Sequence, residues 1–381
     1  MANTFTGLYP TIYAALDKIS RELTGMIPSA GKNTDILEAA LGQTISWPVV
    51  AQGSAGNLTP AAYGPSPSDI TVAAPTFTLN KMRDYSFYLT GEELKGLKSG
   101  SNDQVIVQNE FLQAFRTLTN EIELALWQAA YQGASRAYGT AGTAPFGTAA
   151  DFSDFANVHK ILKDNGAPAA NQHLVIDTRT GLNLFGKQTV LFKVNESGDT
   201  NFLRNGTLGQ VEGTNLHESG QIVAVTKGTG ASYVLNGAHA IGATSIVMKT
   251  GSGTVLAGDT IVLAGDTNKY VVTAGIAAPG TATIGGPGLL AAHSDSDTVT
   301  VGANNTPLVA FDGDAVQLGA RIPAFPPMGD AADDVIVIQD PVTGLPFQIA
   351  MYKQYRRVAY DIAILWGVAA VKSNHIAILL S

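Results

Sequence analysis

Cysteine is absent from the 381-residue sequence, and charged side chains are scarce. Without cysteine the chain has no disulfide framework, no thiolate zinc site and no cysteine nucleophile. Charged residues make up 14% of the chain, against roughly a quarter in ordinary soluble domains. Because the cores of protein interfaces are depleted of charge, this scarcity predicts that much of the surface contacts other protein. The first inference is an extensive oligomer.

Basic runs and long apolar runs are missing as well. The 23 Lys and Arg against 31 Asp and Glu give a net charge of -8, whereas nucleic-acid binding depends on clustered basic residues. Residues 1–5 have neither the basic start nor the apolar run of a secretory signal. The longest apolar stretch, residues 362–371, is far shorter than the ~20 residues that span a bilayer. We expect no membrane partner and a protein that stays where it is made.

The motifs of catalytic, metal and nucleotide sites are also lacking. The histidines do not have HExxH spacing, and neither GxSxG nor GxxxxGK[ST] occurs. The acidic clusters at residues 295–297, 312–314 and 330–334 do not fit the twelve-residue calcium loop and are interpreted as solvated turns. Each histidine is interpreted as a surface residue or a satisfied core residue; they are His159, His173, His217, His239, His293 and His375. We predict no enzyme activity, no cofactor, and no catalytic, cofactor-binding or metal-binding residues.

The amino-terminal quarter predicts a short helix followed by an extended arm. Residues 9–23 carry an apolar stripe with helical spacing, and residues 35–41 predict another helical turn or two. Residues 44–88 are rich in proline, which excludes helix through most of the segment, and their later part alternates like strands. This pattern predicts a long two-stranded excursion. An isolated hairpin is marginally stable, so the arm either lies on a neighbouring subunit or packs back on its own domain.

The middle of the chain predicts a long helix and then an α/β domain. Residues 101–104 (SNDQ) fit a capping box, and apolar residues recur every three or four positions until Gly133. A helix of ~30 residues would be ~45 Å long, and its broad apolar face favours packing on a sheet over a coiled-coil seam. A second helix is predicted over 153–165, a buried strand at 173–177 and a turn at 180–185.

The remaining sequence predicts an inserted β domain and a closing hairpin. Between residues 226 and 302 short strands alternate with glycine, aspartate and asparagine, which indicates a small antiparallel barrel or sandwich. The predicted strands are 233–235, 245–249, 260–263, 270–273, 282–284 and 299–301. The parent domain resumes near residue 306. The carboxyl-terminal part predicts a hairpin of strands 335–338 and 347–352, an apolar strand ending at 366–368 and a final strand at 376–380.

The order of these parts resembles the tailed-bacteriophage major capsid proteins of the Hong Kong ninety-seven fold, and within that fold the coat proteins of short-tailed phages with an inserted domain. The segments that carry the resemblance are 11–16 (TIYAAL), 173–185 (HLVIDTRTGLNLF), 265–272 (GDTNKYVV), 340–347 (DPVTGLPF), 350–353 (AMYK) and 363–368 (AILWGV). The resemblance covers essentially the whole chain. It implies an α+β phage capsid fold with an amino-terminal arm, an extended β-hairpin loop, a long spine helix, peripheral and axial domains, and a small all-β inserted domain.

The resemblance also implies a division of the chain. The expected parts are an amino-terminal arm (1–43), an extended loop (44–88), a peripheral domain (89–169) with the spine helix at 102–132, the first part of an axial domain (170–225), an inserted β domain (226–302), the second part of the axial domain (303–335), and a closing β-hairpin with the carboxyl-terminal strands (336–381). The extended loop would lie over an adjacent subunit. Its one lysine, Lys81, lies near its base, so we expect a shell without covalent crosslinks.

The function implied by the resemblance is that of a major capsid protein. Identical subunits would form hexameric and pentameric capsomers of an icosahedral shell, enclosing a double-stranded DNA genome without sequence-specific binding. Scaffolding and portal proteins would be partners, and the protein would be assembled in the host cytoplasm and end in the virion. In this family the inserted domain is implicated in subunit folding and in contacts that guide assembly. The alternative is a phage tail or bacterial surface binding protein whose β domain recognises a ligand.

Overall fold

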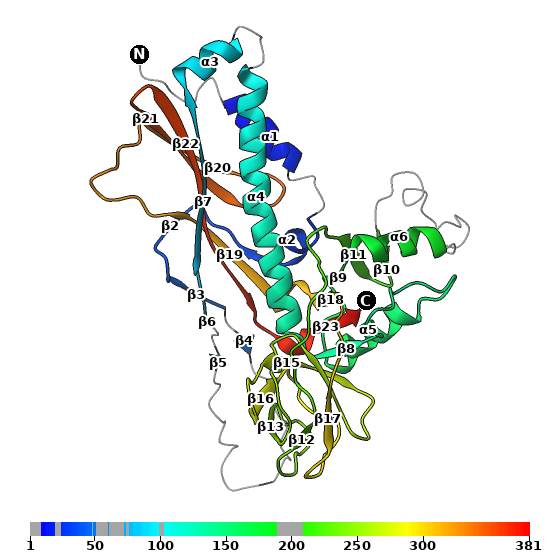
Figure 1. Ribbon diagram of the computed structural model, residues 1–381. Coiled ribbons are helices and arrows are strands. Elements are labelled where there is room, and N and C mark those ends of the chain that lie inside the picture. The colour runs from blue at the N-terminus through cyan, green and yellow to red at the C-terminus, as the bar shows by residue number, and fades with distance from the viewer. Residues whose placement is uncertain are drawn as a thin grey trace.

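The computed structural model describes residues 9–19, 24–47, 49–50, 60, 72–73, 76–98, 103–188 and 209–381. The molecule is elongated: one long helix, α4, runs beside a twisted sheet, and a second sheet and a small β domain lie near the carboxyl end of that helix (Figure 1). The helices are α1 (Tyr9–Ile19), α2 (Met26–Ser29), α3 (Gly91–Lys98), α4 (Asp103–Gln132), α5 (Ser153–Asp164) and α6 (Thr178–Lys187).

Helix α4 confirms the predicted spine helix. Its apolar stripe is buried along its length, at Phe111, Phe115, Leu118, Ile122 and Leu126, and it packs on the sheet strands β7 and β22. Helix α1 lies against it (Figure 1), with Ile12 and Leu16 buried. Half of the predicted capping box, residues 101 and 102, falls outside the described residues, as do positions 20–23 of the first predicted helix.

The sheet beside α4 is organised around one long strand. Strand β22 (Arg357–Ala370) pairs along one edge with β7 (Lys81–Thr90), and along the other with β21 (Pro346–Gln354) and then β19 (Val316–Pro323). Strand β20 (Asp334–Gln339) completes the hairpin with β21, which confirms the predicted closing hairpin. The short strands β1 (Gly31–Asn33) and β2 (Glu38–Ala39) both pair with β19 in parallel.

Two predictions for the amino-terminal quarter are wrong. Residues 35–41 contain no helical turn, because Glu38 and Ala39 pair with β19. The second half of the predicted excursion is β7, which belongs to the main sheet. The described part of the two-stranded ribbon is therefore shorter than predicted. It consists of β3 (Thr44–Ser46) paired with β6 (Thr76–Thr78), and β4 (Val49–Val50) paired with β5 (Val72–Ala73).

The second sheet combines segments that are far apart in sequence. Its strands, in spatial order, are β10 (Gln210–Val211), β11 (Thr214–Glu218), β9 (Gln172–Ile176), β18 (Pro307–Asp312), β23 (Ile376–Leu380) and β8 (Arg136–Tyr138). Helix α5 packs on β8, β18 and β23. Residues 134–164 thus lie with the sheet of the predicted axial domain, although the predicted division placed them with the spine helix in the peripheral domain. Strand β8 was not predicted. The predicted turn at 180–185 is also wrong: it is helix α6, capped by Asp177, whose side chain accepts from the Thr180 amide at 3.0 Å.

The inserted β domain is a closed barrel. Its strands are β12 (Tyr233–Leu235), β13 (Ser245–Lys249), β14 (Thr260–Leu263), β15 (Lys269–Ala274), β16 (Gly280–Ile284) and β17 (Thr298–Val301). They pair antiparallel in the ring β12–β13–β16–β15–β14–β17–β12. All six predicted strands are confirmed, and the barrel alternative is correct. The barrel has its own core, which includes Tyr233, Ile246 and Ile261.

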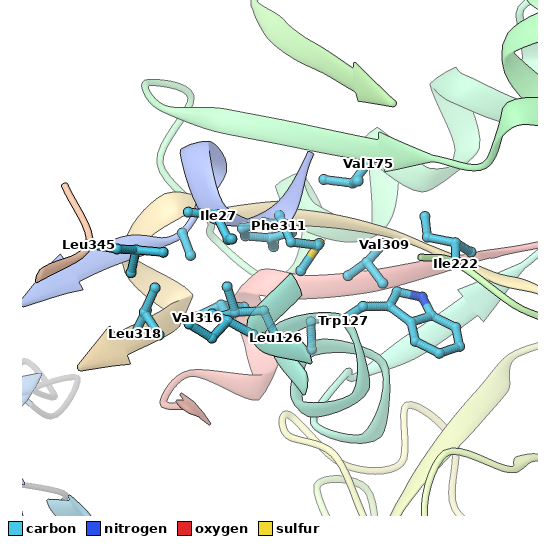
Figure 2. Packing of buried hydrophobic residues seen from close by; sticks show 14 of the residues in the cluster. Ile27, Leu126, Trp127, Val175, Ile222, Val309, Phe311, Val316, Leu318 and Leu345 are labelled. Carbon is cyan, nitrogen blue, oxygen red and sulfur yellow. The ribbon is translucent and has the colours of Figure 1, made fainter. Parts of the chain in front are cut away.

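The core of the body lies where the two sheets meet the carboxyl half of α4. Figure 2 shows Leu126 and Trp127 of α4 among apolar side chains from α2, β18 and β19. The Trp127 indole Nε1 donates to the carbonyl oxygen of Pro307 at 2.8 Å. The buried indole therefore has a hydrogen-bond partner, as buried tryptophans usually do, and this bond fixes the start of β18 against the spine helix.

Candidate assembly surfaces

The base of the ribbon packs on two glycines that lie opposite each other on neighbouring strands of the main sheet. Gly319 of β19 is paired with Gly367 of β22. A Cβ at Gly367 would lie 2.3 Å from the Thr78 carbonyl oxygen, and one at Gly319 would lie 2.7 Å from the Ile45 Cδ1 atom. Only the absence of side chains lets the ribbon approach this closely. The contact is sealed by a small apolar cluster of Ala39, Leu79, Leu365 and Ile45, separate from the main core.

The segment that precedes the ribbon is held by a buried carboxylate of the spine helix. Glu123 is fully buried, and its oxygens accept from the backbone amides of Gly25, Met26 and Ile27 at 2.6, 2.6 and 2.9 Å. These amides open helix α2 and have no partner within it. Burial raises the pKa of Glu123, against the opposing effect of these hydrogen bonds and one from Ser219. This contact could not be predicted from local sequence patterns, because its partners are about a hundred positions apart.

A second polar contact holds the same segment at the sheet. Arg321 of β19 donates to the carbonyl oxygen of Asn33 at 2.7 Å and lies 3.2 Å from the Asp35 carboxylate. Lys32 donates to the Thr343 carbonyl oxygen at 3.0 Å. Burial lowers the pKa of Lys32, partly offset by the nearby Asp340 carboxylate. Residues 24–39 are therefore fixed to both the spine helix and the sheet.

The tip of the β21–β22 hairpin forms an open cleft of about 820 Å³ against the start of α3. Its apolar lining is Leu89, Val358 and the ring of Tyr355, which is 91% exposed. Its charged lining consists of Lys95, Lys353, Arg356 and Arg357 against the single acid Glu92. We call this the hairpin cleft. This cleft was not predicted from the sequence. The feature that could have indicated it is the cluster of basic residues at 353, 356 and 357 in an otherwise acidic chain.

Two exposed segments form an apolar ridge at the edge of the main sheet. Backbone bonds join Leu37 to Ile322 at 3.3 Å and Ala39 to Ala324 at 3.2 Å, which places residues 36–41 beside the start of the loop 323–333. This loop contains Phe-Pro-Pro-Met at 325–328 and projects beside β2 (Figure 1). The most exposed apolar residues of the two segments are Ile36, Leu37, Leu41 and Met328, whose exposed fractions are 51%, 60%, 56% and 98%. We call residues 36–41 with 323–330 the apolar ridge.

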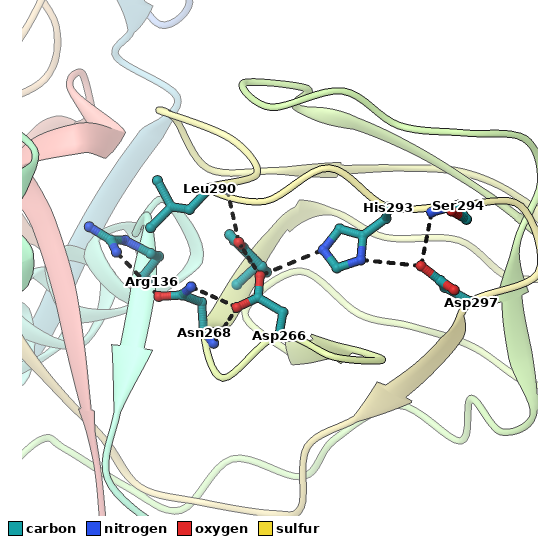
Figure 3. A network of polar contacts seen from close by, with 8 residues as sticks. Arg136, Asp266, Asn268, Leu290, His293, Ser294 and Asp297 are labelled. Atoms are coloured by element: carbon teal, nitrogen blue, oxygen red, sulfur yellow. Dashed lines mark hydrogen bonds and ion pairs between the residues drawn. The ribbon is translucent and has the colours of Figure 1, made fainter.

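The barrel is joined to the body by a polar network (Figure 3). Arg136 of β8 donates to Asn165 Oδ1 at 2.8 Å and to Asn268 Oδ1 at 3.4 Å. Asn268 and Tyr270 both donate to the Asp266 carboxylate, at 2.7 and 2.6 Å. Burial alone would raise the pKa of Asp266, but the hydrogen bonds outweigh it and lower the pKa. Together with the pairing of β8 and β15, this network orients the barrel on the body.

The structure brings four of the six histidines into two pairs. His173 Nδ1 lies 3.1 Å from His217 Nε2 across strands β9 and β11, and His173 Nε2 lies 3.0 Å from Asn171 Oδ1. Burial, with a smaller effect from His217, lowers the pKa of His173 to about 4. His239 and His293 face each other in the barrel through their backbones, and His293 lies between Asp266 and Asp297. Sequence order could not reveal either pair.

One acidic residue predicted in a solvated turn is buried. Asp312 is 4% exposed, at the end of β18, and its carboxylate lies 3.6 Å from His375 Nδ1. Asp314 in the same cluster is exposed, as predicted. Within the described residues no three His, Cys, Asp or Glu side chains are grouped so that they could hold a metal ion. None of the described helices is long and apolar enough to cross a membrane.

Comparison with known proteins identifies the fold. No protein-family model matches the sequence, and no curated protein matches it either. Among solved structures, the capsid asymmetric unit of cyanophage A-1(L) aligns with a TM-score of 0.52 and 12% identity, over 94% of this chain and 92% of that one. The capsid structure of cyanophage P-SCSP1u aligns with a TM-score of 0.49 and 12% identity, over 92% and 86%. The A-1(L) alignment confirms the α+β phage capsid fold predicted from the sequence.

Proposed function

We propose that this chain is a major capsid protein, a structural subunit that assembles with copies of itself into an icosahedral shell around a double-stranded DNA phage genome. The observation that carries the proposal is the shared fold, which extends over nearly the full length of both this chain and the cyanophage A-1(L) capsid protein. No described feature favours the alternative of a ligand-recognising surface or tail protein. The proposed role is structural and not enzymatic.

The features of the surface support this role. The described base of the ribbon packs on the main sheet through a small apolar cluster separate from the main core. The described surface also carries an apolar ridge and an open cleft at separate places on the main sheet. Large exposed apolar areas mark interaction sites on soluble proteins. We further propose the domain division given above, with the boundaries 1–43, 44–88, 89–169, 170–225, 226–302, 303–335 and 336–381. The strand pairings amend it in two places: β7 belongs to the main sheet, and β8 belongs to the second sheet. The proposed partners include scaffolding and portal proteins.

Electron microscopy of the purified protein after size exclusion tests the proposal. Uniform closed particles in the void fraction are the expected result. A small species that stays small after addition of the scaffolding protein encoded with it would contradict the proposal.

The ribbon supplies a second test. If residues 44–78 clasp a neighbouring subunit, deletion of residues 57–69 should leave the subunit folded, because the described base of the ribbon at Phe77 and Leu79 is retained. Shells made from the deleted protein should then dissociate at lower temperature or lower denaturant concentration than unmodified shells. Calorimetry of the assembled particles measures this, with the isolated subunit as reference. Shells of unchanged stability would count against the clasp.

A further inference from the structure

The hairpin cleft is an unusual concentration of positive charge in this chain. Four of its lining residues are basic and one is acidic, although the whole chain carries a net charge of -8. Some of the charge is committed locally: Lys353 lies 2.6 Å from Asp333, and Arg357 stacks on the ring of Tyr88 at 4.6 Å. Arg356 is 72% exposed on its side chain, and its nearest acid, Glu92, is 3.7 Å away and 89% exposed. The cleft therefore presents excess positive charge over an apolar lining.

The apolar ridge has the opposite character. It carries the exposed acids Glu38 and Asp330 beside its apolar side chains. The nearby cation, Arg321 of β19, is 8% exposed and is bound to Asn33 and Asp35. Asp330 accepts from the Tyr352 hydroxyl at 2.7 Å, which fixes the base of the loop against the sheet. Met328, at 98% exposed, is the most exposed large apolar side chain among the described residues. A fixed loop with an apolar tip and acidic flanks is suited to insertion into a basic, apolar-lined cleft.

We propose that the apolar ridge of one copy docks into the hairpin cleft of a second copy. The occupant of the cleft is inferred from charge complementarity between two surfaces of the same chain. Residues 353–358 at the β21–β22 hairpin tip line the cleft. In Figure 1 this tip lies beside α3, and the loop between β19 and β20 projects lower along the edge of the sheet. The contact is heterologous, since different surfaces of the two copies meet, and such contacts close into rings when the rotation permits. This inference rests on the proposed function and names one of the contacts by which the subunits would assemble.

Charge reversal on each side tests the contact. The cleft variant carries Lys95→Glu and Arg356→Glu, and the ridge variant carries Glu38→Lys and Ala324→Lys. These exposed positions leave the Arg357–Tyr88 and Asp330–Tyr352 contacts in place. Each should lower the yield of closed particles at least ten-fold, because like charges then face each other across the contact. A chain that carries all four substitutions restores opposite charges and should recover most of the yield. The yield is measured by sedimentation and electron microscopy.

Two controls keep the test specific. Lys160→Glu changes the net charge in the same direction as the cleft substitutions at an exposed position on α5, and it should leave assembly unchanged. Thermal melts of every variant as a subunit establish that each is folded. Particle yields unaffected by either reversal would overturn the docking proposal while leaving the capsid proposal intact. The same holds if folded four-substitution chains fail to recover. Absence of particles from the unmodified chain, with its scaffolding protein present, would overturn both.

Discussion

Replacing Gly367 by alanine should displace the ribbon without unfolding the subunit. The added Cβ would lie 2.3 Å from the Thr78 carbonyl oxygen and 3.1 Å from the Leu79 Cα atom. An ordinary carbon–oxygen contact is about 3.3 Å or longer, so the ribbon base must move by roughly 1 Å. Because the obstacle is backbone, no rotation of a side chain relieves it.

The cost of this substitution can be bounded from the local packing. Overpacking a well-packed site costs about 1–3 kcal/mol, and the cluster affected here is small and separate from the main core. At Gly319 the nearest atoms belong to the side chains of Ile45, Phe77 and Leu79. Since side chains give way more readily than backbone, Gly319→Ala should cost less than Gly367→Ala.

Urea denaturation of the subunit and electron microscopy of particles measure the two consequences. Gly367→Ala should lose about 1–3 kcal/mol of unfolding free energy and should form fewer or irregular shells. Gly220→Ala is the matched control, since a Cβ there meets no atom within 4 Å and Gly220 has no positive φ. If Gly367→Ala matched this control in both assays, the glycine pair would not be what positions the ribbon.

Three further predictions concern the core and the response to pH. Phe115 is fully buried with its ring centroid 5.0 Å from that of Phe347, so Phe115→Ala should cost the subunit about 3–5 kcal/mol in urea denaturation; a loss below 1 kcal/mol would contradict the packing. Burial, with Asp84 and then Asp330 adding to it, raises the pKa of Asp361 to about 6. Its ionisation therefore lowers stability as pH rises from about 4 to 6, and Asp361→Asn should stabilise the subunit at pH 7 by about 1–2 kcal/mol after allowance for solvent screening; no gain at pH 7 would refute this. His173 has its pKa lowered to about 4, so it stays neutral in the folded state while the unfolded chain takes up a proton below about pH 6.5. This difference lowers the free energy of unfolding by about 2 kcal/mol as pH falls from 6.5 to 4. His173→Gln should flatten that part of the pH–stability curve, and an unchanged slope would exclude this role.

Local sequence patterns predicted those elements whose stabilising contacts are local or repetitive. The barrel strands were located because the segments that separate them contain glycine, aspartate or asparagine. Helix α4 was located because its stripe is uninterrupted over thirty residues. Helix α6 was missed because Gly181 and Gly186 weaken its propensity, and the Asp177 cap that starts it was not recognised. Strand β8 is three residues long and exists because β23 and β15 lie on either side of it.

The surfaces could not be predicted in the same way, because they depend on residues that are distant in sequence. Nothing in the neighbourhood of Glu123 indicates that it binds the amides of residues 25–27. The apolar ridge likewise exists only because β2 pairs with β19 and brings residues 36–41 beside the loop 323–333. What the sequence did predict was the need for such surfaces, through its low content of charge.

In this subunit, the polar residues that hold the fold together differ from the exposed charged residues that are available for contacts between copies. The polar groups that fix the fold are buried and used internally, as Glu123 is at α2, Arg321 at the amino-terminal segment and Arg136 at the barrel. A buried polar group stabilises a structure only when its partners are in place, so these contacts hold the parts of the subunit in one arrangement. The exposed cations Lys95 and Arg356 of the hairpin cleft lie outside the core and take no part in these buried contacts. They can therefore be changed to alter contacts between copies while the subunit itself keeps its fold.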